Sequence, residues 1–221
     1  ERAQGGIGIL MGGVPGTEPA KVLVIGGGVV GANAAYIARG MGANVTILDR
    51  SIPTLRRLDI DFHGKANCVY ATKEAIEKYA IQSDLVIGAV LVPGASAPKL
   101  ISRELISKMK TGSVVVDVAI DQGGCFETSR ATTHQDPTFV VDGVVHYCVA
   151  NMPGAVPQTS TYALNNATLP FSLSMANQGW KKAMQADKDL LNGLNVHAGK
   201  LCYEAVAQAQ GLEYTDPRTL I

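Results

Sequence analysis

The feature that most constrains this chain is a glycine-rich turn between an apolar segment and an alanine-rich one. The apolar segment is Lys21–Ile25, the glycines are Gly26, Gly28 and Gly31, and residues 32–41 have the spacing of a helix. In such a turn the first glycine allows a sharp bend, the second lets the backbone approach a ligand, and the third lets the helix pack closely on the sheet. Free N–H groups at the helix start bind pyrophosphate well. The pattern therefore predicts a dinucleotide-binding unit.

An acidic residue at the end of the next apolar segment supports this interpretation. Asp49 stands about 20 residues after the third glycine, where a carboxylate accepts hydrogen bonds from an adenosine ribose. An isolated Asp would more often be an ordinary turn or capping acid, but the strand, glycines and helix before it favour cofactor binding. The carboxylate would repel a 2′-phosphate, whereas the adjacent Arg50 could accommodate one. NAD is the predicted cofactor, in preference to NADP.

Strand-like and helix-like segments alternate along the first two thirds of the chain. Most of the strand-like segments are continuous apolar runs rich in Val and Ile, which is typical of strands covered on both faces. The expected strands are Lys21–Ile25, 45–48, 68–71, 85–90, 113–118, 139–141 and 144–149. The expected helices are 32–41, 54–62, 72–81 and 103–109; in the first, Ala34, Ala38 and Met41 share a face and Gly42 ends the helix. This alternation predicts an α/β fold, a Rossmann-type doubly wound parallel sheet.

The composition changes after Asn151. Residues 151–161 are rich in Pro, Gly, Ser and Thr and are expected to form a connection. Two helices, 160–185 and 196–210, should follow, with Pro170 kinking or dividing the first. These helices lack strand partners and predict a second domain. The expected domains are residues 1–157, which bind NAD(H), and residues 158–221, a C-terminal helical part of a substrate domain.

Charge and cysteine content exclude several functional classes. Lys plus Arg and Asp plus Glu number 19 each, so the net charge is zero and neither nucleic acid nor an anionic membrane is the expected partner. No apolar run is long enough to cross a bilayer. The four cysteines lie far apart, which favours reduced thiols in a cytoplasmic protein. The chain opens on Glu1 without an initiator Met, which leaves open that it is a fragment or a chain whose start is missing.

In open α/β sheets, ligands lie beyond the C-terminal ends of the strands. Three predicted strands run into candidate turns, at residues 91–94, 119–127 and 150–153. Asp121 could hold a substrate ammonium group or orient the nicotinamide and a water, and a turn Asp bonded to the backbone is the equal alternative. Asn151 and Met152 could contact the nicotinamide, although a loop Asn and a gap-filling Met are more common. His146 lies within an apolar strand and is expected to be a hydrogen-bonded core residue.

Several longer runs are more specific than the glycine pattern. They are the runs 87–94, 116–127, 149–153 and 160–170, which accompany the glycine turn and Asp49. With these runs the chain resembles the alanine dehydrogenase family over nearly its whole length. Enzymes of that family oxidise L-alanine reversibly to pyruvate and ammonia with NAD and usually form hexamers. The resemblance implies this activity, these substrates and a homo-oligomer, a hexamer, for the present protein.

The resemblance also assigns residues. Asp121 matches the family's active-site aspartate. The expected cofactor-binding residues are Gly26, Gly28, Val29, Gly31, Asp49, Val90, Leu91, Val118, Arg130, Val149, Asn151 and Met152. Thr54 and Ala71 stand where the family often has polar residues on the adenosine side, so those contacts should be altered. The Arg and Lys that bind the substrate carboxylate, and the His of acid–base chemistry, belong to a segment that precedes this chain in the family.

Two other functions remain open from the sequence. The nucleotide-binding component of a proton-translocating transhydrogenase shares this architecture, although an acidic or basic residue would be expected there in place of the run Ile120-Asp121-Gln122. A non-catalytic NAD-sensing module would need only the unit from Gly26 to Asp49 and not the loops that carry Asp121 and Asn151. Activity with alanine separates these alternatives from the dehydrogenase.

Overall fold

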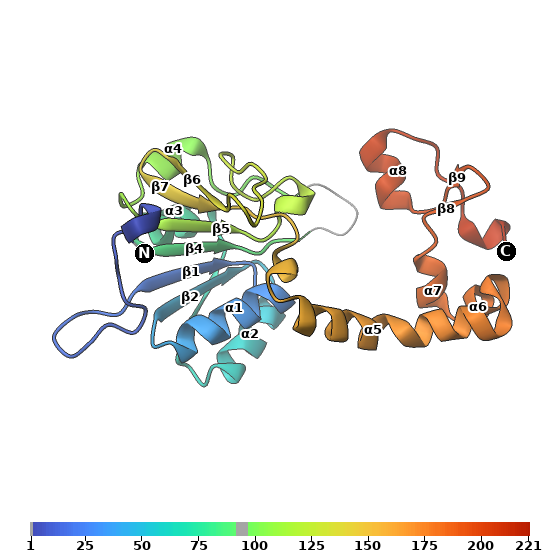
Figure 1. Ribbon diagram of the computed structural model, residues 1–221, viewed down its shortest axis with the longest axis horizontal. Helices are drawn as coiled ribbons and strands as arrows, with labels where there is room; N and C mark the ends of the chain where they lie inside the picture. Colours follow the sequence, from blue (N-terminus) through green and yellow to red (C-terminus); the bar gives the residue numbers. More distant parts are fainter. Residues whose placement is uncertain (1, 92–96) are drawn as a thin grey trace. The chain divides into compact units, whose positions relative to one another are not determined.

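A computed structural model describes residues 2–91 and 97–221 of the chain. Residues 92–94 of the turn expected after the strand at 85–90 lie outside the described residues. The chain divides into two compact units, residues 2–91 with 97–152, and residues 153–221. Figure 1 shows the path of the chain through both units.

The first unit is built on a seven-stranded sheet with the order β3-β2-β1-β4-β5-β7-β6. Its strands are β1 (Lys21–Ile25), β2 (Asn44–Asp49), β3 (Asn67–Tyr70), β4 (Leu85–Gly88), β5 (Val114–Asp117), β6 (Thr138–Val141) and β7 (Val144–Tyr147). All neighbouring pairs are parallel except β6 with β7, which is antiparallel. The predicted doubly wound α/β sheet is thereby confirmed, with an antiparallel strand at one edge.

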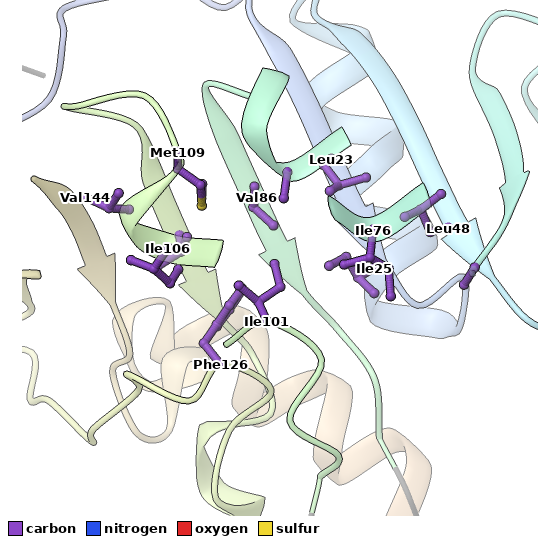
Figure 2. Packing of buried hydrophobic residues seen from close by; sticks show 13 residues of the cluster. Leu23, Ile25, Leu48, Ile76, Val86, Ile101, Ile106, Met109, Phe126 and Val144 are labelled. Carbon is purple, nitrogen blue, oxygen red and sulfur yellow. The ribbon is translucent and has the colours of Figure 1, made fainter. Parts of the chain in front are cut away.

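Helices cover both faces of this sheet. Successive side chains of a strand point to opposite faces, and in the central strands the side chains on both faces are apolar. The helices are α1 (Val29–Gly40), α2 (Ile52–Asp61), α3 (Lys73–Gln82) and α4 (Arg103–Ser107), preceded by the short 3-10 helix η1 (Arg2–Gln4). In β1, Val22 and Val24 pack in the cluster that contains residues of α1 and α2. Leu23 and Ile25 pack in the opposite cluster, with residues of α3 and α4, part of which Figure 2 shows. Burial on both sides explains why these strands are continuous apolar runs.

The bounds of α1 differ from those expected from the sequence. The helix begins at Val29 and ends at Gly40, so Met41 lies in the cap beyond the last helical residue and is 57% exposed. Gly31, Ala35 and Ala38 are the buried residues of the helix. Gly42 has a φ of +87°, and the chain leaves the helix there as expected.

The second unit also differs from its sequence-based prediction. A single helix, α5 (Pro157–Gln178), runs through Pro170, and the break comes at Gly179, before α6 (Trp180–Ala186) and α7 (Lys188–Asn192). None of the side chains of α5 is buried within the described chain, so water can hydrate the backbone carbonyl that Pro170 leaves unbonded. Gly179 has φ 79° and ψ 148°, a conformation that glycine adopts far more readily than other residues. The connection expected at 151–161 is accordingly shorter, because α5 begins at Pro157.

The predicted helix at 196–210 is partly a hairpin. The strands β8 (Val196–His197) and β9 (Lys200–Leu201) pair antiparallel, and α8 (Glu204–Gln210) follows, with η4 (Pro217–Thr219) near the end. Ala198 and Gly199 connect the two strands with φ values of +51° and +76°. Positive φ at both central residues is the signature of a tight hairpin turn, and this turn displaces the start of the helix.

Among the helices of the described residues, none combines the length and the apolar character that crossing a bilayer requires.

Candidate functional site

The predicted site residues cluster by topology at one edge of the sheet. The strands β1, β2, β4, β5 and β7 run in the same direction, so their C-terminal ends share an edge. The glycine turn follows β1, Asp49 ends β2, and the segment that carries Asp121 follows β5. The ends of β1 and β4 are joined by a hydrogen bond from the Ala89 N–H to the Ile25 carbonyl, at 2.8 Å. Parallel sheets of this type bind ligands at this edge.

Two of the three motif glycines are required by close packing. Gly26 has a φ of +102°, and a side-chain carbon there would lie 2.7 Å from the Ala89 carbonyl oxygen. A side-chain carbon at Gly31 would overlap the carbonyl oxygen of Gly26. Gly31 therefore allows α1 to start directly against the turn, as the sequence predicts.

Gly28 serves a different purpose, because its environment is open. A side-chain carbon at Gly28 would meet no atom of residues 2–91 or 97–221 within 4 Å. Gly28 is the N-cap of α1, and within the part of the chain that the structure describes no side chain caps the helix start. The first N–H groups of α1 therefore remain free to donate, and they lie at the positive end of the helix dipole. This arrangement fits a phosphate group.

Asp49 is half-buried and touches the glycine turn. Its Oδ2 accepts a hydrogen bond from the Gly27 N–H at 2.7 Å, and its Oδ1 accepts one from the Ser51 N–H at 2.7 Å. A carboxylate has about four acceptor positions, so these two bonds leave capacity for hydroxyl donors. Asp49 can therefore hold the turn and still bind a ribose.

Gly27 lies in the same turn and Arg57 contacts it from α2, and neither was predicted as a site residue from the sequence. A side-chain carbon at Gly27 would lie 2.6 Å from Leu58 Cδ1. Arg57 Nη2, on α2, donates a hydrogen bond to the Gly27 carbonyl oxygen at 3.2 Å. In a trans peptide the C=O and the following N–H point in opposite directions, so this bond also orients the Gly28 N–H. The only sequence signal for Gly27 was its place within the motif, and nothing marked Arg57.

Asp121 is an exposed residue of the short 3-10 helix η2 (Ile120–Gln122), directly after β5. Gly123 ends this helix with a φ of +88°, in the left-handed region. Val118, the first residue of the segment, is half-buried, and its N–H bonds the Gly88 carbonyl of β4 at 3.0 Å. The backbone that presents Asp121 is thus tied to the centre of the sheet.

The remaining predicted cofactor residues differ in exposure. Val29 and Leu91 are 82% and 62% exposed at the edge of the sheet, and Val90 is half-buried beside Gly26. Val149 has 0% exposure, so it packs beneath the edge and presents no surface to a ligand in this structure. Its neighbours Asn151 and Met152 are more accessible.

Arg130 and the loop at Asn151 are held by aromatic and hydrogen-bonding neighbours. The Arg130 guanidinium carbon lies 4.2 Å from the centre of the Phe139 ring. Asn151 has a φ of +55°, which Asn tolerates better than most residues, and its carbonyl oxygen lies 3.0 Å from His134 Nε2. Met152 opens the short helix η3 (Met152–Ala155).

His146 is a core residue, as the sequence predicts. It is fully buried, its Nδ1 lies 2.9 Å from the Val144 carbonyl oxygen, and its Nε2 lies 2.7 Å from the Thr128 hydroxyl. Burial lowers the pKa of His146 below its ordinary value and outweighs the opposing effect of the Val144 carbonyl. The neutral ring that results is enclosed in the protein and does not serve as a surface acid or base.

The thiol of Cys125, four residues after Asp121, is also chemically unreactive. Cys125 is buried, and burial, with a smaller effect from the Asp117 carboxylate, raises its pKa to about 12. A thiol with that pKa stays protonated and is a poor nucleophile. All four cysteines of the chain are free.

Comparisons with known proteins agree with this geometry. An alanine dehydrogenase from Halomonas elongata is 64% identical over 221 residues, which are 100% of this chain and 60% of that protein. An alanine dehydrogenase from Mycolicibacterium smegmatis is 55% identical over 215 residues, covering 97% of this chain and 58% of the relative. The chain therefore spans about 60% of the length of these curated relatives.

Solved structures give the same result. A structure of L-alanine dehydrogenase superimposes with a TM-score of 0.88 at 52% identity and covers 96% of this chain and 58% of its own. A transhydrogenase from Sinorhizobium meliloti has a TM-score of 0.65 at 27% identity and covers 86% of this chain and 51% of its own. Residues 1–204 match the family described as Alanine dehydrogenase/PNT, C-terminal domain. Because that match covers most of the chain, this protein belongs to the alanine dehydrogenase/PNT C-terminal domain family.

Proposed function

We propose that this chain is the nucleotide-binding part of an NAD-dependent L-alanine dehydrogenase, which converts L-alanine reversibly to pyruvate and ammonia. One observation carries the proposal: the open glycine turn with Asp49 and the exposed Asp121 lie at the same edge of the sheet. The first feature suits the adenosine and pyrophosphate of a dinucleotide, and the second suits a reacting centre. Relatives named alanine dehydrogenase support the substrate.

The described residues fit NAD. The uncapped start of α1 beside Gly28 would bind the pyrophosphate, and the spare acceptor positions of Asp49 would bind the adenosine ribose. Leu91 and Val29, both exposed at this edge, would cover the dinucleotide with apolar contacts. Asp49 favours NAD over NADP because its charge repels a 2′-phosphate, although Arg50 stands next to it.

The nicotinamide ring, when bound, supplies the hydride acceptor for alanine oxidation. Asp121 would hold the substrate nitrogen or the water that hydrolyses the resulting iminium, because its carboxylate is exposed at the edge where the ring would end. Arg130, Asn151 and Met152 would complete the nicotinamide side. In this proposal residues 1–157 form the NAD-binding domain and residues 158–221 contribute to the substrate domain.

We further propose that the protein acts in the cytoplasm as a homo-oligomer, a hexamer as the family resemblance implies. Three exposed apolar residues of the α1 region support self-association: Tyr36, Ile37 and Met41 are 69%, 61% and 57% exposed. The free cysteines suit a reducing compartment.

The test is NADH formation by the full-length protein with L-alanine, and the reverse reaction with pyruvate and ammonium. The proposal predicts alanine-dependent reduction of NAD in preference to NADP. Hydride exchange between NADH and an NADP analogue without any response to alanine would instead support a transhydrogenase component. NAD binding without either activity would support a sensing module.

A further inference from the structure

A buried carboxylate lies behind the segment that carries Asp121. Asp117 is the last residue of β5, stands opposite Gly88 of β4 in the sheet register, and has 0% exposure. A buried Asp is uncommon unless hydrogen bonds compensate for its lost hydration. The bonds that it makes therefore indicate its role.

Among the described residues, the hydrogen bonds to the Asp117 carboxylate all come from the segment that follows it. Its Oδ1 accepts from the Ala119 N–H at 3.2 Å. Its Oδ2 accepts from the Cys125 N–H at 2.8 Å, the Phe126 N–H at 3.2 Å and the Ser129 hydroxyl at 2.5 Å. Hydrogen bonds to an ionised acceptor are roughly twice as strong as neutral ones. One carboxylate thus holds both the start and the end of the turn from residue 118 to residue 129.

Gly124 shows how closely the chain folds around this group. It has a φ of +77°, and a side-chain carbon there would lie 2.6 Å from Asp117 Oδ2. Phe126, two residues later, has 0% exposure and is anchored in the core cluster, where Figure 2 shows it beside Ile101. Between the end of β5 and this anchor, Asp121 is presented on an otherwise irregular segment.

The segment is also held from its other side by residues 97–100. The Ala97 N–H bonds the Gln122 carbonyl at 2.9 Å, and the Leu100 N–H bonds the Cys125 carbonyl at 2.8 Å. Lys99 Nζ donates to the carbonyl oxygens of Gly123 and Phe126. Residues 97–100 donate to carbonyl groups of the segment, whereas the N–H and O–H groups of the segment donate to Asp117. The two sets of bonds use different backbone groups and together fix the turn.

We propose that Asp117 is a positioning residue that fixes the turn so that Asp121 is presented to the substrate in one orientation. Asp117 is fully buried, so its effect on the reaction passes through the backbone of residues 118–126. The effect on turnover rests on the proposed function, because it uses the role given there to Asp121. The effect on the turn itself rests on the geometry alone.

The substitution Asp117→Asn keeps the size of the side chain and removes its charge. An amide has one oxygen and one NH2 group, so one of the two positions becomes a donor that faces other donors. If the NH2 group takes the Oδ2 position, it meets three of them; if it takes the Oδ1 position, it meets the Ala119 N–H. Either orientation loosens the turn.

The matched control is Asp84→Asn. Asp84 is another buried carboxylate that links segments of the same sheet: it accepts from the Lys21 N–H at 2.8 Å and from Lys110 Nζ at 2.7 Å. It precedes β4 and therefore lies at the opposite, N-terminal edge. A general loss of stability affects both variants, whereas a positioning effect is confined to Asp117→Asn.

Full-length wild type and both variants are compared in three measurements. For Asp117→Asn we expect kcat with L-alanine to fall about 10- to 100-fold, the range that small displacements of reacting groups produce. ADP-ribose, which lacks the nicotinamide, should keep its wild-type dissociation constant, because the site around Gly26 and Asp49 is intact. Amide hydrogen exchange should rise in residues 118–129. For Asp84→Asn we expect wild-type kcat and unchanged exchange in this segment.

Ser129 offers a milder pair of variants in case Asp117→Asn does not fold. Ser129→Ala removes one of the four donors, so kcat should fall less and exchange in the segment should rise less. Ser129→Thr keeps a hydroxyl and should restore both. Equal loss of kcat in Asp117→Asn and Asp84→Asn, or unchanged exchange and kcat in Ser129→Ala, would overturn the proposal.

The two proposals fail in distinguishable ways. If the wild type does not oxidise alanine, the proposed function is wrong, and the exchange measurements still test whether Asp117 fixes the turn. If the wild type is active and Asp117→Asn keeps both its kcat and its exchange pattern, the positioning role is wrong and the proposed function stands.

Discussion

The Asp49 carboxylate accepts a hydrogen bond from the Gly27 N–H at 2.7 Å, so the residue expected to bind the adenosine ribose also holds the glycine turn. Its other oxygen accepts from the Ser51 N–H and fixes the start of α2. The Gly27 carbonyl is bonded in turn by Arg57 from that helix. The turn is therefore shaped before a ligand arrives, which reduces the ordering that binding requires.

Replacing Asp49 should affect affinity and cofactor preference together. Asp49→Asn removes the charge that would bond the ribose hydroxyls and repel a 2′-phosphate. Hydrogen bonds to charged groups contribute about 1.5–3 kcal/mol, so NAD affinity should fall about ten-fold or more. The affinity for NADP should fall less or rise. Calorimetric titration with both dinucleotides measures this, and an unchanged preference for NAD would contradict the role given to Asp49.

The substitutions Gly27→Ala and Gly28→Ala should have different effects on stability and on NAD binding. Gly27→Ala places a carbon 2.6 Å from Leu58 Cδ1, so we expect a loss of stability of about 1–3 kcal/mol. Gly28→Ala places a carbon that no atom of the described residues approaches within 4 Å, so it should leave the free energy of unfolding nearly unchanged while obstructing the pyrophosphate. Denaturant unfolding and NAD titration of both variants separate the effects. Equal destabilisation by the two substitutions would be inconsistent with the structure.

Arg57 can be tested against its neighbour on the same helix. Arg57→Gln loses the bond to the Gly27 carbonyl and should weaken NAD binding about two- to ten-fold, as expected for one hydrogen bond. Because the effect lies on the pyrophosphate side, kcat at saturating NAD should be retained. Arg56→Gln removes an exposed arginine one residue earlier and should bind NAD as the wild type does. Equal losses in both variants would point to general charge attraction instead.

His146 should make the stability of the fold depend on pH. Burial lowers its pKa in the folded state, so the unfolded chain binds a proton more readily. Stability that is present above a pH of about 6.5 is then lost as the pH falls through the lower folded pKa. The midpoint of thermal unfolding should therefore fall more steeply with acidification in wild type than in His146→Gln. Parallel pH curves for the two proteins would show that His146 contributes nothing.

Much of the first unit could be predicted because its sequence signals are local and agree with the packing. The continuous apolar strands, such as Lys21–Ile25, are buried on both faces, and Gly26 and Gly31 have contacts that exclude a side chain. The helix α1 was expected at 32–41 but spans Val29–Gly40, because its first turn starts within the glycine motif. The burial of Val149 follows from tertiary packing, which the strand pattern does not reveal.

The second unit and the supporting residues were harder to predict. Pro170 is tolerated because α5 is exposed, and the hairpin at Ala198 and Gly199 depends on φ values that the sequence only weakly indicates. Asp117 and Arg57 act through bonds to backbone groups, at a separation of 8 residues for Cys125 and of 30 residues for Gly27. Such bonds leave no periodic pattern in the chain. An acid at the end of an apolar run was the one available signal for Asp117.

The most direct test of the central claim is the Asp121→Asn variant of the full-length protein, measured for NADH formation from L-alanine and for NAD affinity. Asp121 is exposed in η2, so the substitution should leave the fold intact. Asp136→Asn, an exposed acid of the loop that precedes β6, is the control and should be fully active. The account predicts that Asp121→Asn loses turnover while its NAD dissociation constant stays close to that of the wild type. Wild-type turnover in Asp121→Asn would contradict the account.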